Sequence, residues 1–237
     1  TTISSGGFIT ENSLSEITYN NFQIFVLAVC LLFPIFNFYL LFKILTRDFN
    51  IKNYQEDLHL LIIIIITTLL FYFFVIPSEN LAKIFLYVTS SISTSGMSVY
   101  TSDQDISLLF LLLTIIGGSL FSTSSGLKYV RIYVLLKTSY QEIYKLVKPI
   151  NVFNRNLFNQ DVKISNEDSN ICFFIFISFI LSLFVLSGLL TLENFTFDQA
   201  FKLSLLTLTN TTSSSLYGMD NLTFIDLTSF TKLNLII

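Results

Sequence analysis

Three short strings rich in serine, threonine and glycine carry neutral oxygen atoms that could bind a cation. The candidate ligands are Ser4, Ser5, Gly6 and Gly7 in the first string, Thr94, Ser95 and Gly96 in the second, and Asn210, Thr211 and Thr212 in the third. None of these residues is acidic. Carbonyl and hydroxyl oxygens without a carboxylate suit a weakly hydrated monovalent ion better than Ca²⁺. The strings therefore indicate a site for a monovalent cation.

The spacing of the strings suggests an internal repeat. Gly7 aligns with Gly96 at an offset of 89 residues, and Gly96 aligns with Thr212 at an offset of 116. Short helices, too short to cross a bilayer, are predicted before the second and third strings, at Asn80–Ser91 and Phe197–Leu208. One such string alone would be read as a solvated turn. Three copies at the same place in a repeated unit favour loops that enter the membrane.

A second glycine- and serine-rich segment interrupts an apolar stretch. It follows Ile106–Ile116 and precedes Leu127–Leu136, neither of which is long enough to cross a bilayer alone. We predict an intramembrane loop that lies beneath the strings and acts as a gate; the alternative is a water-exposed turn between two helices. The predicted gate residues are Gly117, Gly118, Ser119, Ser122, Thr123, Ser124, Ser125 and Gly126.

Two basic residues, Lys128 and Arg131, follow this loop on one face of the next predicted helix. Their functional interpretation is contact with the gate loop or with lipid phosphate. The alternative is that they anchor the helix at the cytoplasmic membrane surface.

The composition places these features in a membrane. Of the 237 residues, 52% are hydrophobic and only 12% are charged, about half the usual charged fraction of a soluble protein. Four crossings are predicted, the third of them broken by the gate loop, and Pro34 in the first is expected to be a tolerated kink. The unbroken spans are Phe22–Phe42, Leu58–Ile76 and Ile171–Leu192.

The distribution of charge predicts which side each connection faces. Segments 43–57 and 128–170 hold ten of the thirteen Lys and Arg residues, so they are expected in the cytoplasm and the strings outside. The net charge of −3 offers no basic surface for nucleic acid. The sequence contains neither a Walker-type GxxxxGK[ST] motif nor a GxSxG motif, and it has a single histidine. These observations argue against an ATP-binding protein and an intramembrane protease, and we expect no enzyme.

Several of these stretches resemble the Trk/Ktr/HKT superfamily of potassium transporters, most closely the bacterial Trk-type membrane subunit. The matching stretches are SSGGFIT (Ser4–Thr10), STSGMS (Ser93–Ser98), IGGSLFSTSSGLKYVRI (Ile116–Ile132) and FTKLNLI (Phe230–Ile236). The resemblance implies an all-α membrane protein of repeated helix–pore-loop–helix units around a pseudo-fourfold pore. It also implies that the three strings are ion filters that hold K⁺.

On this resemblance the chain divides into parts of a larger whole. Residues 1–57 would be the end of a second unit, 58–137 a third unit with the broken gate helix, 138–170 a cytoplasmic linker, and 171–237 a truncated fourth unit. The chain begins Thr1-Thr2-Ile3 without a methionine, and we expect it to be a fragment that lacks the first unit and most of the final helix.

The implied function is uptake of K⁺, passive or coupled to another ion, through the bacterial inner membrane. No cofactor is expected besides the transported ion. The implied partners are the lipid bilayer, a second copy in a homodimer, and a cytosolic nucleotide-binding regulatory subunit. Three alternatives stay open: the pore subunit of an ATP-driven potassium pump, a Na⁺-permeable relative, and a nonfunctional fragment. Thr212 stands where the family has glycine, and this change motivates the second alternative.

Overall fold

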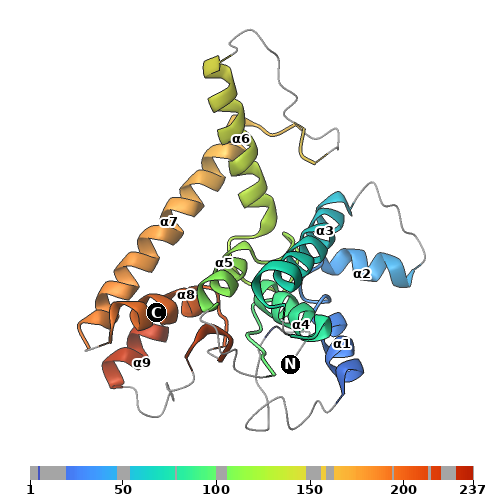
Figure 1. Cartoon of the computed structure of the whole chain (residues 1–237). Coiled ribbons are helices and arrows are strands. Elements are labelled where there is room, and N and C mark those ends of the chain that lie inside the picture. Colours follow the sequence, from blue (N-terminus) through green and yellow to red (C-terminus); the bar gives the residue numbers. More distant parts are fainter. Residues whose placement is uncertain are drawn as a thin grey trace.

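The computed structural model describes residues 5, 20–46, 54–77, 79–99, 106–147, 156–158, 163–193, 195–212, 215–219 and 228–236. Over these residues the chain is built from helices and contains no strand (Figure 1). An isolated bridge between Asn156 and Lys163 is the one β-type pairing among them. The predicted all-α fold class is confirmed.

In the described part of the chain, two helices are long and apolar enough to cross a membrane. The first is α3 (Gln55–Leu70), which continues into the π-helical turn η3 (Phe71–Val75), and the second is α7 (Asn166–Thr191). Most of their apolar side chains lie on the outside of the molecule, and only 22% and 17% of the two apolar segments are buried. Exposed apolar helices of this length are typical of a surface that faces lipid. The predicted spans over 58–76 and 171–192 are therefore confirmed as helices.

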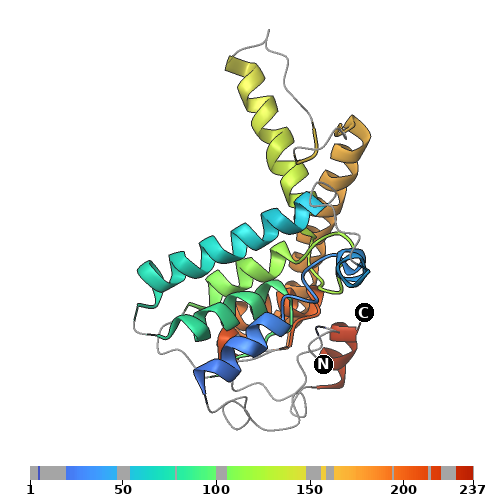
Figure 2. The same cartoon turned by 90° about the vertical axis from the view of Figure 1, so that its right-hand side faces the viewer.

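The predicted first span is not one helix, and the expectation of a mere kink was wrong. α1 (Asn21–Cys30) ends before Pro34, and α2 (Phe38–Leu45) begins after it in a different direction (Figures 1 and 2). Proline has no N–H to donate and its ring crowds the preceding turn. The Asn37 side chain then caps α2 by accepting a hydrogen bond from the backbone N–H of Tyr39 at 2.9 Å.

The third crossing is broken as predicted. α5 (Ser107–Ile116) ends at Gly117, and α6 (Tyr129–Val147) begins after the loop. α6 is longer than the predicted segment 127–136 and continues past residue 137, so the first part of the predicted cytoplasmic linker is helical. It packs against α7, and its C-terminal end projects from the body (Figures 1 and 2).

The two short helices form at the predicted places and lie inside the molecule. α4 (Leu81–Ile92) packs against α1, α3 and α5, and every residue from Leu86 to Ile92 is buried. α8 (Phe197–Leu208) packs against α7 and α5, with the stretch from Lys202 to Leu206 buried. The short helices η4 (Ser215–Tyr217) and α9 (Ser229–Ile236) complete the fold.

Candidate functional site: two converging strings and the loop beneath them

The second and third strings have the same backbone hydrogen bonds at the ends of α4 and α8. In the second, the N–H groups of Ser93, Thr94 and Ser95 donate to the carbonyls of Thr89, Ser91 and Ser90; in the third, those of Thr209, Asn210 and Thr211 donate to Leu205, Thr207 and Leu206. Each donor and each acceptor in the third string is 116 residues beyond its counterpart. The offset predicted from sequence is therefore reproduced bond by bond.

All three strings turn through the left-handed backbone region at the same position. The φ angles are 50° at Ser5, 58° at Thr94 and 48° at Asn210, and these residues are separated by the offsets of 89 and 116. Such angles are unfavourable for residues with a side chain, although short polar side chains tolerate them best. The sequence pointed only to the glycines as left-handed positions and missed these three. The remaining first-string residues, Ser4, Gly6 and Gly7, lie outside the described residues.

The second and third strings converge in space. The Thr212 hydroxyl donates a hydrogen bond to the carbonyl oxygen of Ser95. A Cβ placed on Gly96 would overlap the Thr212 carbonyl oxygen and lie 2.6 Å from the Thr212 Oγ1. Gly96 has a φ of +69°, whereas Thr212 is not among the described residues with a positive φ. Thr94, Ser95 and Thr211 are buried beside this contact.

The two limbs of the predicted gate loop approach each other closely and are joined by a hydrogen bond. Gly117 (φ +63°) and Gly126 (φ +84°) lie where its two limbs meet. There, a Cβ on Gly117 would overlap the backbone carbonyl of Ser125, so this close approach requires glycine. Within the loop, the N–H of Gly118 donates to the Ser124 hydroxyl at 2.8 Å. The loop is therefore a compact, ordered element and not an extended linker.

The gate loop touches two of the strings. The N–H of Ser125 donates to the Thr94 Oγ1 at 3.0 Å, and the Ser5 hydroxyl donates to the carbonyl of Thr123 at 3.2 Å. The structure thus brings the loop against the first and second strings, while the third string contacts the second. Seven of the ten predicted ligands are described, and all but Asn210, which is exposed, belong to one connected cluster with the loop.

On its other side the gate loop pairs with the turn at Pro34. The N–H of Ser124 donates to the Pro34 carbonyl at 3.0 Å, and the N–H of Ser119 donates to the Ile35 carbonyl at 2.9 Å. In return, the N–H of Phe38 donates to the Phe121 carbonyl at 3.0 Å. In an unbroken helix, residues 38 and 39 would satisfy these two carbonyls, so the break at Pro34 provides the acceptors that the loop uses.

The side chain of Lys128 reaches back into the gate loop. Its Nζ donates to the Ser122 carbonyl at 3.0 Å, to the Ser122 hydroxyl at 3.1 Å and to the Ser124 carbonyl. The structure therefore places Lys128 in the predicted contact. Arg131 lies in the first turn of α6, and its charge repels that of Lys128.

Two acidic residues at the start of α3 also belong to this site, and the sequence reasoning missed them. The Glu56 Oε1 accepts a hydrogen bond from the backbone N–H of Leu120, at the tip of the gate loop, at 2.8 Å. The Asp57 Oδ1 accepts one from the backbone N–H of Asn37 at 2.9 Å. The one available signal was a pair of adjacent acids at the end of an otherwise apolar span.

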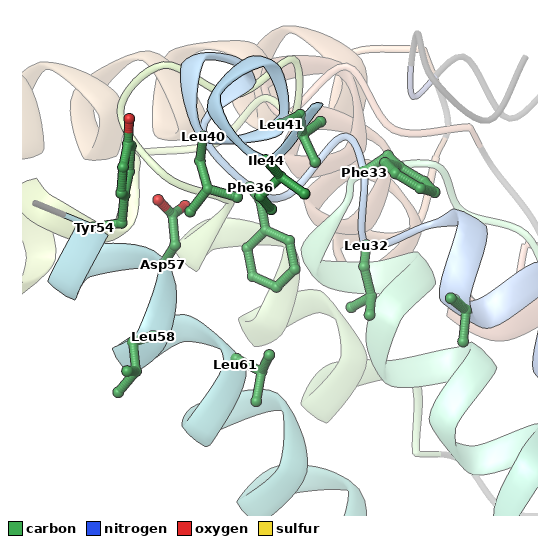
Figure 3. Close-up of a pocket in the computed structure, with 11 residues that line it drawn as sticks. Leu32, Phe33, Phe36, Leu40, Leu41, Ile44, Tyr54, Asp57, Leu58 and Leu61 are labelled. Atoms are coloured by element: carbon green, nitrogen blue, oxygen red, sulfur yellow. The ribbon is translucent and has the colours of Figure 1, made fainter. Parts of the chain in front are cut away.

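An apolar groove of about 420 Å³ lies between α2 and α3, next to these acids. Figure 3 shows the Asp57 carboxylate at one end of the groove, near Tyr54 and Leu40, with Phe36 and Leu61 further along. Its walls are almost entirely hydrocarbon, so it suits an apolar group and not a hydrated ion.

Comparison with known proteins identifies the fold. No family model matches the sequence, and no curated protein matches it. The crystal structure of the potassium transporter TrkH from Vibrio parahaemolyticus is similar over 99% of this chain and 52% of TrkH, with a TM-score of 0.87 and 22% sequence identity. The chain thus spans about half the length of that protein. It is an all-helical membrane protein with the fold of a Trk-type transporter.

Proposed function

We propose that this chain takes part in the uptake of monovalent cations, with K⁺ as the ion, through a pathway lined by the three strings. The observation that carries the proposal is the cluster in which uncharged strings at the ends of two buried half-helices meet above one compact loop. The C-terminal ends of α4 and α8 lead into the strings, and a helix C-terminus carries partial negative charge. Carbonyl oxygens in this setting can replace the hydration shell of a cation.

The loop from Gly117 to Gly126 is proposed as the gate. It contacts the strings on one side and the Pro34 turn on the other, so it occupies the route that an ion leaving the strings would follow. The loop lies in a protein interior, where irregular backbone at membrane depth is tolerated. Its movement would open the route without unfolding either α5 or α6.

Thr212 supports a second candidate, a Na⁺-permeable pathway. Its hydroxyl binds the Ser95 carbonyl, one of the oxygens proposed to face the ion. A carbonyl already engaged in a hydrogen bond is a weaker ligand, so the ring would discriminate less between K⁺ and Na⁺.

The proposed function also implies an orientation in the membrane and binding partners. The strings would face outside and the linker 138–170 the cytoplasm, in a bacterial inner membrane. A homodimer and a cytosolic nucleotide-binding regulator are the proposed partners.

The test is ion uptake in cells that lack their own potassium uptake, with the protein expressed from its native coding sequence. The proposal predicts uptake of K⁺, and higher flux when Ser122–Ser125 is deleted. A matched control replaces the exposed ion pair Lys145–Glu142 on α6 by alanines, which should leave the flux unchanged. Absence of uptake by correctly inserted protein would refute the proposed function. Uptake that the deletion leaves unchanged would refute the gate.

A further inference from the structure

We propose that Glu56 is a positioning residue that holds the gate loop in its closed position. The inference rests on the proposed role of the loop as a gate. On this inference, a side chain of another helix, α3, keeps the loop closed, and not a residue of the loop itself.

The contact lies at the tip of the loop, where movement would be largest. The side chains of Leu120 and Phe121 are 39% and 68% exposed, so burial contributes little to fixing them. The backbone on either side is held from outside the loop: Glu56 accepts the N–H of Leu120, and Phe38 donates to the carbonyl of Phe121. Of these two bonds only the first involves a charged group, and hydrogen bonds to a charged acceptor are the stronger kind.

The second limb of the loop is held by the opposite charge. The Lys128 ammonium group binds the carbonyls of Ser122 and Ser124. The Glu56 carboxyl and the Lys128 ammonium group are near enough for an electrostatic attraction between them when Glu56 is ionised. One charge thus binds the first limb, the other binds the second, and their attraction favours the closed arrangement of both.

Asp57 fixes the position of Glu56. It is buried, with 5% of its surface exposed, and it binds the backbone N–H of Asn37 at the start of α2. Asn37 in turn caps α2. The first turn of α3 is therefore tied to α2 by one acid and to the gate loop by the next.

A simpler role for two acids in the first turn of a helix is to stabilise that helix through its dipole. The contacts argue for more than that. No side chain caps α3 by a hydrogen bond at its N-cap, Tyr54. The hydrogen bonds that the structure gives Glu56 and Asp57 come from Leu120 and Asn37, which belong to other elements.

Three substitutions at Glu56 separate its hydrogen bond from its charge. Glu56→Ala removes both, Glu56→Asp keeps the charge but shortens the reach, and Glu56→Gln keeps an acceptor oxygen of the same reach. We expect Glu56→Ala and Glu56→Asp to raise ion flux about tenfold, the effect of losing one hydrogen bond to a charged acceptor. The ion flux of Glu56→Gln should lie closer to that of the unmodified protein. The flux of Glu142→Ala, on the exposed face of α6, should equal that of the unmodified protein.

A second measurement does not depend on transport. With Cys30 and Cys172 replaced by alanine, a cysteine introduced as Leu120→Cys reports the exposure of the loop tip to a water-soluble thiol reagent. Glu56→Ala should speed its modification, and Glu142→Ala should not.

The outcomes distinguish this inference from the proposed function. If deletion of Ser122–Ser125 raises flux but Glu56→Ala changes neither flux nor modification, the inference is wrong and the gate stands. If no variant transports an ion, the proposed function is wrong, and the modification rate still decides whether Glu56 holds the loop. A faster rate supports the hold, and an unchanged rate overturns it.

Discussion

The second and third strings follow the same path out of their helices but end differently. Their three backbone hydrogen bonds correspond at an offset of 116, and Thr94 and Asn210 share the left-handed turn. At the last position Gly96 is left-handed, whereas Thr212 is not among the described residues with a positive φ, and its hydroxyl bonds to the other string. The comparison separates the backbone turn, which both helix ends produce, from the contact between the strings, which depends on single residues. The turn is common to both strings, and the contact between them depends on Gly96 and Thr212.

The largest effect on ion uptake is expected when Gly96 receives a side chain, as Thr212 has at the corresponding position. Gly96→Ala would force its Cβ into the Thr212 carbonyl, and backbone cannot move aside as a flexible side chain can. The left-handed φ of +69° adds roughly 1–2 kcal/mol of unfavourable energy. Because about 1.4 kcal/mol corresponds to a factor of ten, we expect the variant to lose more than nine-tenths of its ion uptake. The measurement is the initial rate of uptake in cells without other potassium uptake.

Gly188 provides the matched control. It lies within α7, and a Cβ there would have nothing within 4 Å. Gly188→Ala should leave uptake unchanged and stabilise the helix by about 0.5–1 kcal/mol. Equal uptake by Gly96→Ala and Gly188→Ala would show that the two strings do not need their close approach.

The reverse substitution, Thr212→Gly, should have an intermediate effect. It frees the Ser95 carbonyl from a hydrogen bond worth about 1 kcal/mol, and so should raise the preference for K⁺ over Na⁺ about fivefold. Thr212→Ser keeps the hydroxyl and should behave like the unmodified protein. The measurement is the ratio of K⁺ to Na⁺ uptake at equal concentrations. An identical ratio for Thr212→Gly would show that this hydroxyl does not affect selectivity.

Much of the fold was predictable because the signals were local. Apolar stretches of about 20 residues predicted α3 and α7, and composition predicted the short helices α4 and α8. The clustering of glycine predicted the break between α5 and α6. These features depend on residues close together in the sequence, where composition and backbone preference act directly.

The missed features are contacts between distant backbone groups. Pro34 was expected only to bend a helix, yet the turn around it supplies the carbonyls that hold Ser119 and Ser124. Glu56 was missed because its partner is the main-chain N–H of Leu120, which has no side-chain signature. Every residue but proline carries such a group, so a sequence does not show which of them will meet.

The smallest effect concerns the position that the two strings share. Thr94 and Asn210 have nearly the same φ, but only the Thr94 hydroxyl accepts a hydrogen bond from the gate loop, at Ser125. Asparagine tolerates the left-handed backbone better than the β-branched threonine, so the strain changes differently in Thr94→Ala and in Asn210→Ala. Thr94→Ser is the matched control, because it keeps a hydroxyl at the same position and differs from Thr94→Ala mainly by one neutral hydrogen bond, about 1 kcal/mol.

If that bond helps to hold the loop, Thr94→Ala should show a few-fold higher flux than Thr94→Ser, which keeps the hydroxyl. The assay is the same initial rate of uptake, normalised to the amount of protein in the membrane. Equal flux in Thr94→Ala and Thr94→Ser would mean that the second string touches the gate loop without restraining it. The loop would then be held by the Pro34 turn, by the first string through Ser5 and by the charged side chains.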